Sequence, residues 1–343
     1  MKVLVLKRDK LGDLLLTTPL LARLKEGLPQ AETHLLANDY NSWVVAGNPH
    51  IDRLWVYRRV RHAGSISVSA AWQWLRQSLA LRRERYDWVI IANGDESPRA
   101  IRRGLSLRGI RTVAHCVDAS NYPGLSDPVA PDASGHEVER LLALLAPLGM
   151  PAPPAQGSRS AHFPRYVLPA ASADFAREWL AERGLSQGGY VLLGLGARRP
   201  KKQPSTAQVL AWSAHVKAAW GLDTVFTWTP GKADDARYPG DDEVAQPVLD
   251  ARAPQIHPFR GPIPQALGLI WSARTCLFPD SGLMHFAAAS PGGVLGFFAE
   301  SDVSPSPAQW APRGPRAHYL EAEKSVAELP AELIYARLAK LLG

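Results

Sequence analysis

The chain has 343 residues, enough for about two domains of ordinary size. Apolar residues make up 46% of it and charged residues 21%, a globular composition that excludes a disordered or collagen-like chain. Its two cysteines are too few for a disulfide framework or a zinc site of their own. No apolar run is long enough to span a bilayer or to serve as a signal peptide, so we expect a cytoplasmic protein.

Short apolar strands alternate with helical patterns through the first half of the chain. Strands are predicted over 3–6, 33–37, 53–57, 88–92 and 112–116, and helices over 13–26, 70–83 and 137–146. This alternation predicts a parallel sheet that is covered by helices on both faces. Prolines, glycine and serines over 151–160 then predict a linker.

The same alternation restarts after the linker. Helices are predicted over 171–183, 206–220, 264–273 and 282–289, and strands over 190–196, 224–228, 275–279 and 294–298. We therefore expect a first domain over 1–155 and a second doubly wound domain over 156–325. A last helix within 326–343 is expected to pack back on the first domain.

The formal net charge of +7 favours an anionic partner, although a mildly basic surface can also serve solubility alone. Arg58, Arg59, Arg61 and His62 follow the predicted strand 53–57, so they begin a loop beyond its carboxyl end, where α/β sheets bind ligands. Arginine suits bidentate contacts to phosphate, whereas a solvated loop is the simpler alternative. No zinc-finger spacing or ribonucleoprotein aromatic signature accompanies the arginines, so we expect no nucleic-acid partner.

Three loops at predicted strand ends could carry chemistry. In the first, Gly12 allows a sharp turn and Asp13 starts a helix, where its carboxylate could cap the helix or act as a general base. In the second, glycines at 194 and 196 precede four cations within 198–202, which could hold a diphosphate or form an ordinary turn. In the third, Asp280 ends a strand before the helix that carries His285, a residue that could be structural or functional.

Four motifs together resemble the signatures of the lipopolysaccharide heptosyltransferases, which belong to glycosyltransferase family 9. The motifs are Lys7, Gly12, Asp13, Thr17 and Pro19; Lys201-Lys202-Gln203-Pro204; Trp228-Thr229-Pro230-Gly231 with Asp234 and Asp235; and Asp280-Ser281-Gly282-x-x-His285 with the run 297–302. They touch both predicted domains in the family's order. Gln203 stands where the family has tryptophan, and Glu300-Ser301-Asp302 replaces its usual Gly-Pro-Thr-Asp run.

The resemblance implies a GT-B architecture, with two Rossmann-like doubly wound parallel-sheet domains that face a central cleft. The first domain would bind the acceptor and the second the nucleotide sugar. The implied enzyme is an inverting glycosyltransferase that moves a heptose from ADP-heptose to the inner core of lipopolysaccharide, on an acceptor of the Kdo-lipid A type. Asp13 would be the general base that deprotonates the acceptor hydroxyl.

The resemblance and the loop positions also define the expected binding residues. The donor set is Lys201, Asp235, Asp280, Ser281, Gly282, His285, Gly196 and Lys10. The acceptor set is Arg58, Arg59, Arg61 and His62. Because cations and helix N-termini can meet the diphosphate charge, we expect no cofactor and no strict need for a metal.

The expected partners are the nucleotide sugar, a phosphorylated glycolipid and the anionic inner face of the inner membrane, with the protein a peripheral monomer. Three other functions remain open at this point. The chain could be a relative that uses another nucleotide sugar or acceptor. It could be a sugar-nucleotide epimerase of the same fold, or a nucleotide-binding module without catalysis in which Asp13 only caps a helix.

Overall fold

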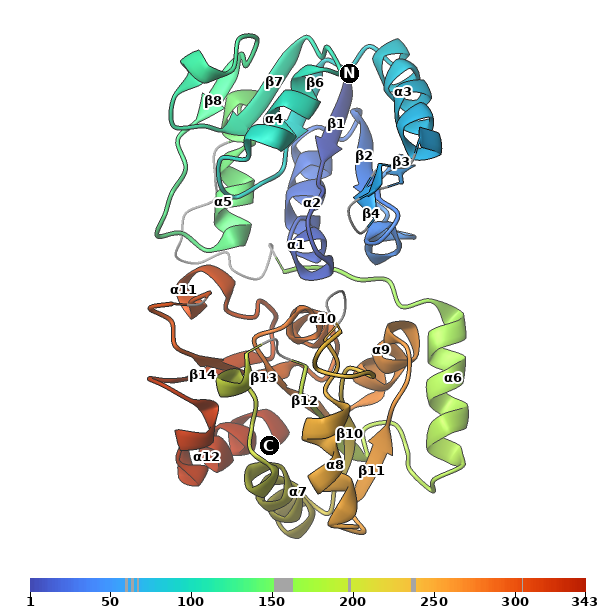
Figure 1. Cartoon of the computed structure of the whole chain (residues 1–343), viewed down its shortest axis with the longest axis vertical. Coiled ribbons are helices and arrows are strands. Elements are labelled where there is room, and N and C mark those ends of the chain that lie inside the picture. The colour runs from blue at the N-terminus through green and yellow to red at the C-terminus, as the bar shows by residue number, and fades with distance from the viewer. Residues whose placement is uncertain are drawn as a thin grey trace. The chain divides into compact units, whose positions relative to one another are not determined.

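The computed structural model describes residues 1–58, 61–62, 65–66, 68–150, 163–196, 199–235, 239–303 and 305–343, with the backbone alone described at 61–62, 65–66, 68–71 and 74. The chain forms two compact units, Met1–Val167 and Leu168–Gly343 (Figure 1). The predicted boundary at residue 155 falls in 151–162, outside the described residues. Each unit is an α/β domain built around a six-stranded sheet.

The sheet of the first unit is wholly parallel, in the order β3-β2-β1-β6-β7-β8. Its strands are β1 (Lys2–Leu6), β2 (Glu32–Asn38), β3 (Arg53–Tyr57), β6 (Trp88–Ile91), β7 (Arg111–His115) and β8 (Asp127–Val129). A short antiparallel hairpin, β4 (Arg61–His62) and β5 (Ser65–Ile66), follows β3. The strand order reverses between β1 and β6, and this switch point is where open α/β sheets bind ligands.

Helices cover both faces of the first sheet (Figure 1). They are α1 (Leu11–Leu15), α2 (Thr18–Gly27), α3 (Val68–Arg83), α4 (Pro98–Leu105) and α5 (Glu137–Ala143). Leu81 of α3 and Ile101 of α4 share a buried cluster with Leu4 and Val89 of the central strands. Helices α2 and α5 contact each other on the opposite face.

The second unit repeats the same topology, with the parallel order β11-β10-β9-β12-β13-β14. Its strands are β9 (Tyr190–Gly194), β10 (Asp223–Thr227), β11 (Ile256–Phe259), β12 (Thr275–Pro279), β13 (Val294–Ala299) and β14 (Ala317–Ala322). Here the strand order reverses between β9 and β12. The loops after these two strands therefore flank the switch point of the second sheet.

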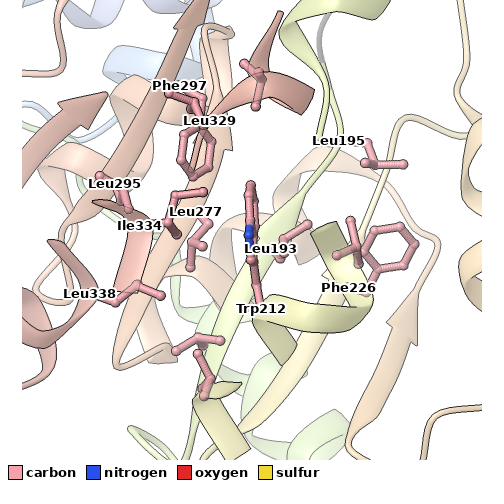
Figure 2. Close-up of a cluster of buried hydrophobic side chains, with 14 of the residues drawn as sticks. Leu193, Leu195, Trp212, Phe226, Leu277, Leu295, Phe297, Leu329, Ile334 and Leu338 are labelled. Carbon is pink, nitrogen blue, oxygen red and sulfur yellow. The ribbon is translucent and has the colours of Figure 1, made fainter. Parts of the chain in front are cut away.

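The helices of the second unit are α6 (Ala170–Ala181), α7 (Thr206–Trp220), α8 (Asp242–Asp250), α9 (Ile263–Ser272), α10 (Gly282–Ala289), α11 (Pro307–Trp310) and α12 (Ala331–Leu342). Trp212 of α7 lies at the centre of a core cluster and packs on Phe297 of β13, with ring centroids 5.1 Å apart (Figure 2). Helices α6 and α9 pack together outside this cluster.

One expectation about the helices is corrected. The predicted helix 13–26 is interrupted, because α1 ends at Leu15 and α2 begins at Thr18 with Pro19 in its first turn. A proline there fits a helix start, whereas inside one continuous helix it would remove a hydrogen bond and clash with the preceding turn. The last helix is part of the second unit, because Ile334 and Leu338 of α12 lie in the Trp212 cluster (Figure 2). That it also packs on the first domain stays a prediction.

Candidate active site

Asp13 lies at the switch point of the first sheet, on the first turn of α1. Its Oδ2 atom accepts the backbone N–H of Lys10 at 2.9 Å, so this carboxylate does take part in closing the helix start. The Asp13 side chain is half-buried, and that of Lys10 is exposed. Asp13 therefore combines a structural contact through one oxygen with a second oxygen, Oδ1, that can take up a proton.

Lys7, the residue directly after β1, is the buried cation of this switch point. Its side chain is 1% exposed, and its Nζ lies 3.2 Å from Asp9 Oδ2 and 3.6 Å from Glu137 Oε1. Burial by itself would lower the pKa of Lys7, but the carboxylates of Asp9, Glu137 and Asp13 hold this pKa above its usual value. An ion pair buried this deeply holds the loop that carries Asp13 to the end of β1.

Side chains from two neighbouring strands hold the same loop. Asn93, after β6, donates to Asp9 Oδ2 at 2.7 Å. Asn38 at the end of β2 donates to the Arg8 carbonyl at 2.8 Å, and Asn41 donates to the Asp9 carbonyl at 2.9 Å. Hydrogen bonds to its backbone carbonyls and to the Asp9 side chain thus hold the loop after β1 in place. Sequence reasoning did not use these residues, although polar side chains directly after buried strands were the available signal.

The predicted acceptor residues lie after β3, as expected, but only part of the set is described. Arg58 directly follows β3 and its side chain is exposed. Arg61 and His62 form β4, for which only the backbone is described, and Arg59 lies outside the described residues. Tyr57, at the end of β3, accepts a hydrogen bond from Arg8 Nε at 3.2 Å.

In the second unit, two neighbouring lysines after β9 have different environments. Lys202 is buried, with 5% of its side chain exposed, and forms a short ion pair with Asp280 at the end of β12. Lys201 is 61% exposed, and its Nζ lies 2.7 Å from Glu300 Oε1. The loops after β9 and β12 are therefore joined at the switch point by Lys202, while Lys201 extends from the same turn.

Ser281, Gly282 and His285 lie where α10 begins after β12. Ser281 precedes the helix, and its Oγ is buried with no hydrogen-bond partner among the residues that the structure describes. Gly282 is exposed at the first helical position, and His285 is buried one turn further on. The arrangement offers a hydroxyl and the amide groups of a helix start close to the Asp280–Lys202 pair.

Gly196 and Asp235 lie on the loops that follow β9 and β10. Gly196 is half-buried, and a Cβ atom at this position would lie in ordinary contact with Thr229, 3.6 Å away. Packing therefore does not by itself demand a glycine at 196. Asp235 is exposed on a turn in which its backbone N–H donates to the Lys232 carbonyl.

Asp241 and Asp242, which were not among the predicted site residues, hold the loop after β10 in place. Gln203 Nε2 donates to Asp241 Oδ1 at 2.7 Å, and Trp228 Nε1 donates to Asp242 Oδ1 at 2.7 Å. Burial raises the pKa of Asp241, whereas hydrogen bonds from Arg260 and Trp228 hold the pKa of Asp242 well below its usual value. Gln203, which stands where the family has tryptophan, thus has a polar partner in Asp241.

Among the residues that the structure describes, no group of three or more histidine, cysteine, aspartate or glutamate side chains is placed to hold a metal ion. None of the helices described here has the length and apolar character needed to cross a membrane.

Comparison with known proteins shows that the chain is similar to glycosyltransferases. No family model matches the chain. The chain is 26% identical over 296 residues to lipopolysaccharide heptosyltransferase 3 of Escherichia coli, covering 85% of this chain and 81% of that protein. A glycosyl transferase family 9 structure from Veillonella parvula has a TM-score of 0.80 at 18% identity, covering 99% of this chain and 97% of its own. E. coli heptosyltransferase WaaC with ADP has a TM-score of 0.74 at 16% identity, covering 99% of this chain and all of its own.

Each unit holds a parallel sheet whose strands, when counted along the chain within that sheet, lie in the order 3-2-1-4-5-6. Two such units, and the likeness to the two glycosyltransferase structures, define the GT-B class of fold and confirm the fold predicted from the sequence. Within this class, the chain is similar to the lipopolysaccharide heptosyltransferases of glycosyltransferase family 9. The resemblance found in the sequence motifs is thereby confirmed. The protein is accordingly an enzyme of the glycosyltransferase type.

Proposed function

We propose that this chain is an inverting heptosyltransferase that transfers a heptose from ADP-heptose to the inner core of a lipopolysaccharide acceptor of the Kdo-lipid A type. The similarity to E. coli lipopolysaccharide heptosyltransferase 3 over 85% of the chain carries the proposal. Structures of E. coli WaaC with ADP and with ADP-2-deoxy-2-fluoro heptose support an ADP-linked donor in that relative.

In this proposal, Asp13 is the general base. It removes the proton from the acceptor hydroxyl while the oxygen attacks the anomeric carbon from the face opposite to ADP, so the configuration at that carbon inverts. The bond to the ADP oxygen breaks, and ADP leaves with the electron pair. Oδ1 is the oxygen suited to take the proton, because Oδ2 is engaged by the Lys10 amide. The rigid loop beneath Asp13 would keep the carboxylate at a fixed position, which a base of this kind needs.

The donor diphosphate would be held by the loops after β9 and β12. Lys201 supplies an exposed cation, and Ser281 and Gly282 supply a hydroxyl and amide groups at the start of α10. These groups favour the negative charge that grows on the departing ADP. Gly196, Asp235, His285 and Lys10 complete the proposed donor set. In this mechanism no cofactor takes part, and we propose no strict need for a metal.

The proposed acceptor is a phosphorylated glycolipid, bound through Arg58, Arg59, Arg61 and His62. The basic run has no acidic residue within it in the sequence, so anionic groups of an acceptor would be its natural counter-ions. Because the proposed acceptor is a lipid, we also propose that the protein acts at the inner face of the inner membrane, where it is peripheral. We propose that it is a monomer.

The test is acceptor-dependent release of ADP. The purified chain is incubated with ADP-heptose and either no acceptor, Kdo-lipid A, or Kdo-lipid A that already carries heptose, and both ADP and the lipid product are measured. We expect ADP and a glycolipid that is heavier by one heptose to form in equal amounts with one of the acceptors. The Asp13→Asn variant is the matched control and should form neither.

The alternatives give different results in the same assay. A relative that uses another nucleotide sugar would leave ADP-heptose intact with every acceptor and would turn over a different donor. An epimerase would convert a nucleotide sugar without any acceptor. A binding module would bind ADP, detected by calorimetry, without turnover of any donor.

A further inference from the structure

Helix α3 of the first unit exposes a stripe of large apolar side chains. Trp72 is 63% exposed, Leu75 50% and Leu79 45%, although the helix is long enough to bury a full apolar face against the sheet. Single exposed apolar residues are common on protein surfaces, but three on one helix form a contiguous feature that calls for an explanation.

The three side chains lie on one side of the helix. At 3.6 residues per turn, residues 72, 75 and 79 fall within about 60° of arc. Leu81 is fully buried and lies on the opposite side, where it joins the core with Val89 and Ile101. One face of α3 therefore already packs on the sheet through Leu81. The Trp72–Leu75–Leu79 stripe is a second apolar face, on the other side of the helix.

Cations accompany the stripe. Arg76 and Arg83 are both exposed, and they fall within about 60° of Leu79 around the same helix. The sixteen residues of α3 contain no acidic side chain. Glu84 follows directly but is already engaged by Lys2 and Arg53, with contacts of 2.6 and 2.7 Å.

The charge of the whole chain is also distributed unevenly. Residues 1–167 hold 22 lysines and arginines against 15 aspartates and glutamates, whereas residues 168–343 hold 17 of each. The entire net charge of +7 therefore belongs to the unit that carries α3. A basic unit with an exposed tryptophan and leucine stripe complements a surface that is anionic outside and apolar just beneath.

We propose that α3 is the element that binds this protein to an anionic membrane. The helix lies in the plane of the interface, with Trp72, Leu75 and Leu79 inserted among the acyl chains just below the headgroups. Arg76 and Arg83 contact the lipid phosphates at the edge of the stripe. Indole rings favour this depth because their apolar body and polar N–H match the boundary between headgroup and acyl chain. The inference adds a specific docking element to the proposed use of a lipid acceptor, but it requires no transfer activity.

The test uses flotation of the full chain with vesicles of phosphatidylcholine alone and of phosphatidylcholine with phosphatidylglycerol. We expect the wild type to float with the anionic vesicles and to remain below with the neutral ones. The triple variant Trp72→Gln/Leu75→Gln/Leu79→Gln should bind anionic vesicles at least about tenfold more weakly. Its matched control is Ile110→Gln/Val117→Gln, which removes apolar side chains that are 74% and 80% exposed elsewhere on the same unit and should bind as the wild type does.

A second pair of variants tests how much the arginines beside the stripe contribute to binding of anionic vesicles. Arg76→Gln/Arg83→Gln should weaken binding to anionic vesicles by about fivefold per arginine and reduce its dependence on salt. The control Lys324→Gln/Lys340→Gln removes two exposed cations from the second unit and should leave binding unchanged.

Three results would overturn the proposal. Equal binding of the triple variant and the wild type would remove α3 from the membrane contact. Binding to neither kind of vesicle by a folded wild type would exclude the membrane as the occupant. A wild-type dimer that the triple variant converts to monomers would assign the stripe to contact between copies of the chain. Because no donor or acceptor is present, none of these outcomes depends on the heptosyltransferase assay.

Discussion

The ammonium group of Lys202, and not that of its neighbour Lys201, is buried against the carboxylate of Asp280. This ion pair joins the loop after β9 to the end of β12, with 5% and 12% of the two side chains exposed. Lys201 is mostly exposed and pairs instead with Glu300. The two lysines of one motif thus have separate environments: Lys202 joins the two loops at the switch point, and Lys201 is the exposed cation that we propose for the donor site.

The first prediction separates these roles by substitution. Lys202→Met should lower the free energy of unfolding by about 3–5 kcal/mol, because it leaves the Asp280 carboxylate buried without its cation. Lys201→Met should change stability by less than about 1 kcal/mol, as expected for an exposed pair, and should weaken binding of ADP. Urea unfolding and calorimetry with ADP give the two quantities.

The double variant Lys202→Met/Asp280→Asn serves as the control, since it removes both charges and should recover part of the lost stability. Unchanged ADP affinity in the Lys201→Met variant would take this lysine out of the donor site. Unchanged stability in the Lys202→Met variant would mean that the ion pair does not hold the two loops together.

The second prediction concerns the two functions of the Asp13 carboxylate. Asp13→Asn keeps an oxygen that can accept the Lys10 N–H but cannot serve as the base, so transfer should fall by about 100-fold to 10,000-fold while the protein stays folded. Asp13→Ala should lose the same activity and also about 0.5–2 kcal/mol of stability. Melting curves, turnover and ADP binding are measured on one preparation of each variant. Retained turnover in a folded Asp13→Asn variant would disprove the base assignment.

Most of the regular structure could be predicted from local patterns. Strand 275–279 and helices 206–220 and 282–289 match the structure at both ends. These segments are continuous apolar runs or begin at a capping residue such as Ser205, whose hydroxyl accepts the Gln208 N–H. The edge strands β8, β11 and β14 were missed, because short or half-polar strands lack the apolar run that marks a central strand.

The third prediction concerns Lys7, which lies beneath the loop that leads to Asp13. Lys7→Met should destabilise the first unit by about 3–5 kcal/mol, because the Asp9 carboxylate would lose its buried cation and Glu137 would keep only Arg140, at 4.0 Å. Transfer should fall as well, since the loop that carries Asp13 loses its anchor. Thermal unfolding and turnover below the melting temperature measure both effects. The double variant Lys7→Met/Glu137→Gln removes one of the stranded charges and should be more stable than the single variant; equal stability would contradict the proposed pairing.

The fourth prediction compares two carboxylates of the loop after β10. Burial raises the pKa of Asp241, so above the ordinary aspartate range the folded state keeps a proton that the unfolded state has lost, and stability falls as the pH rises toward the folded-state pKa. Asp241→Asn should therefore flatten the decline in stability that begins above about pH 4. Asp235→Asn should leave stability within about 0.5 kcal/mol of the wild type and raise the KM for the donor.

Urea unfolding across this pH range and donor kinetics distinguish the two aspartates. If Asp241→Asn raised the donor KM while Asp235→Asn did not, the contact to the nucleotide sugar would belong to Asp241. An unaltered pH dependence in the Asp241→Asn variant would contradict the shifted pKa.

The candidate site was harder to predict than the fold. The signature residues at the two switch points, such as Asp13 and Asp280, could be found because Asp280 directly follows a predicted strand and Asp13 starts the helix that follows the first predicted strand. The ion pairs beneath them could not. Lys7 and Lys202 look like surface cations in a basic sequence, and their burial depends on carboxylates 130 and 78 positions away, Glu137 and Asp280. Only the tertiary arrangement of the strands brings such partners together.

The last prediction concerns the basic run after β3. Arg58 is exposed directly beyond the strand end, and the sequence contains no acidic residue between it and the end of α3. If the acceptor is phosphorylated, Arg58→Ala/Arg59→Ala/Arg61→Ala should raise its KM by about tenfold or more, because each arginine lost removes a charge-assisted contact. The dependence of acceptor KM on salt should also flatten, with ADP affinity unchanged. Arg177→Ala, which removes an exposed arginine paired with Asp174 in the second unit, is the control and should leave all three quantities unaltered. Acceptor kinetics that match the wild type across a salt series would show that the run is a solvated loop.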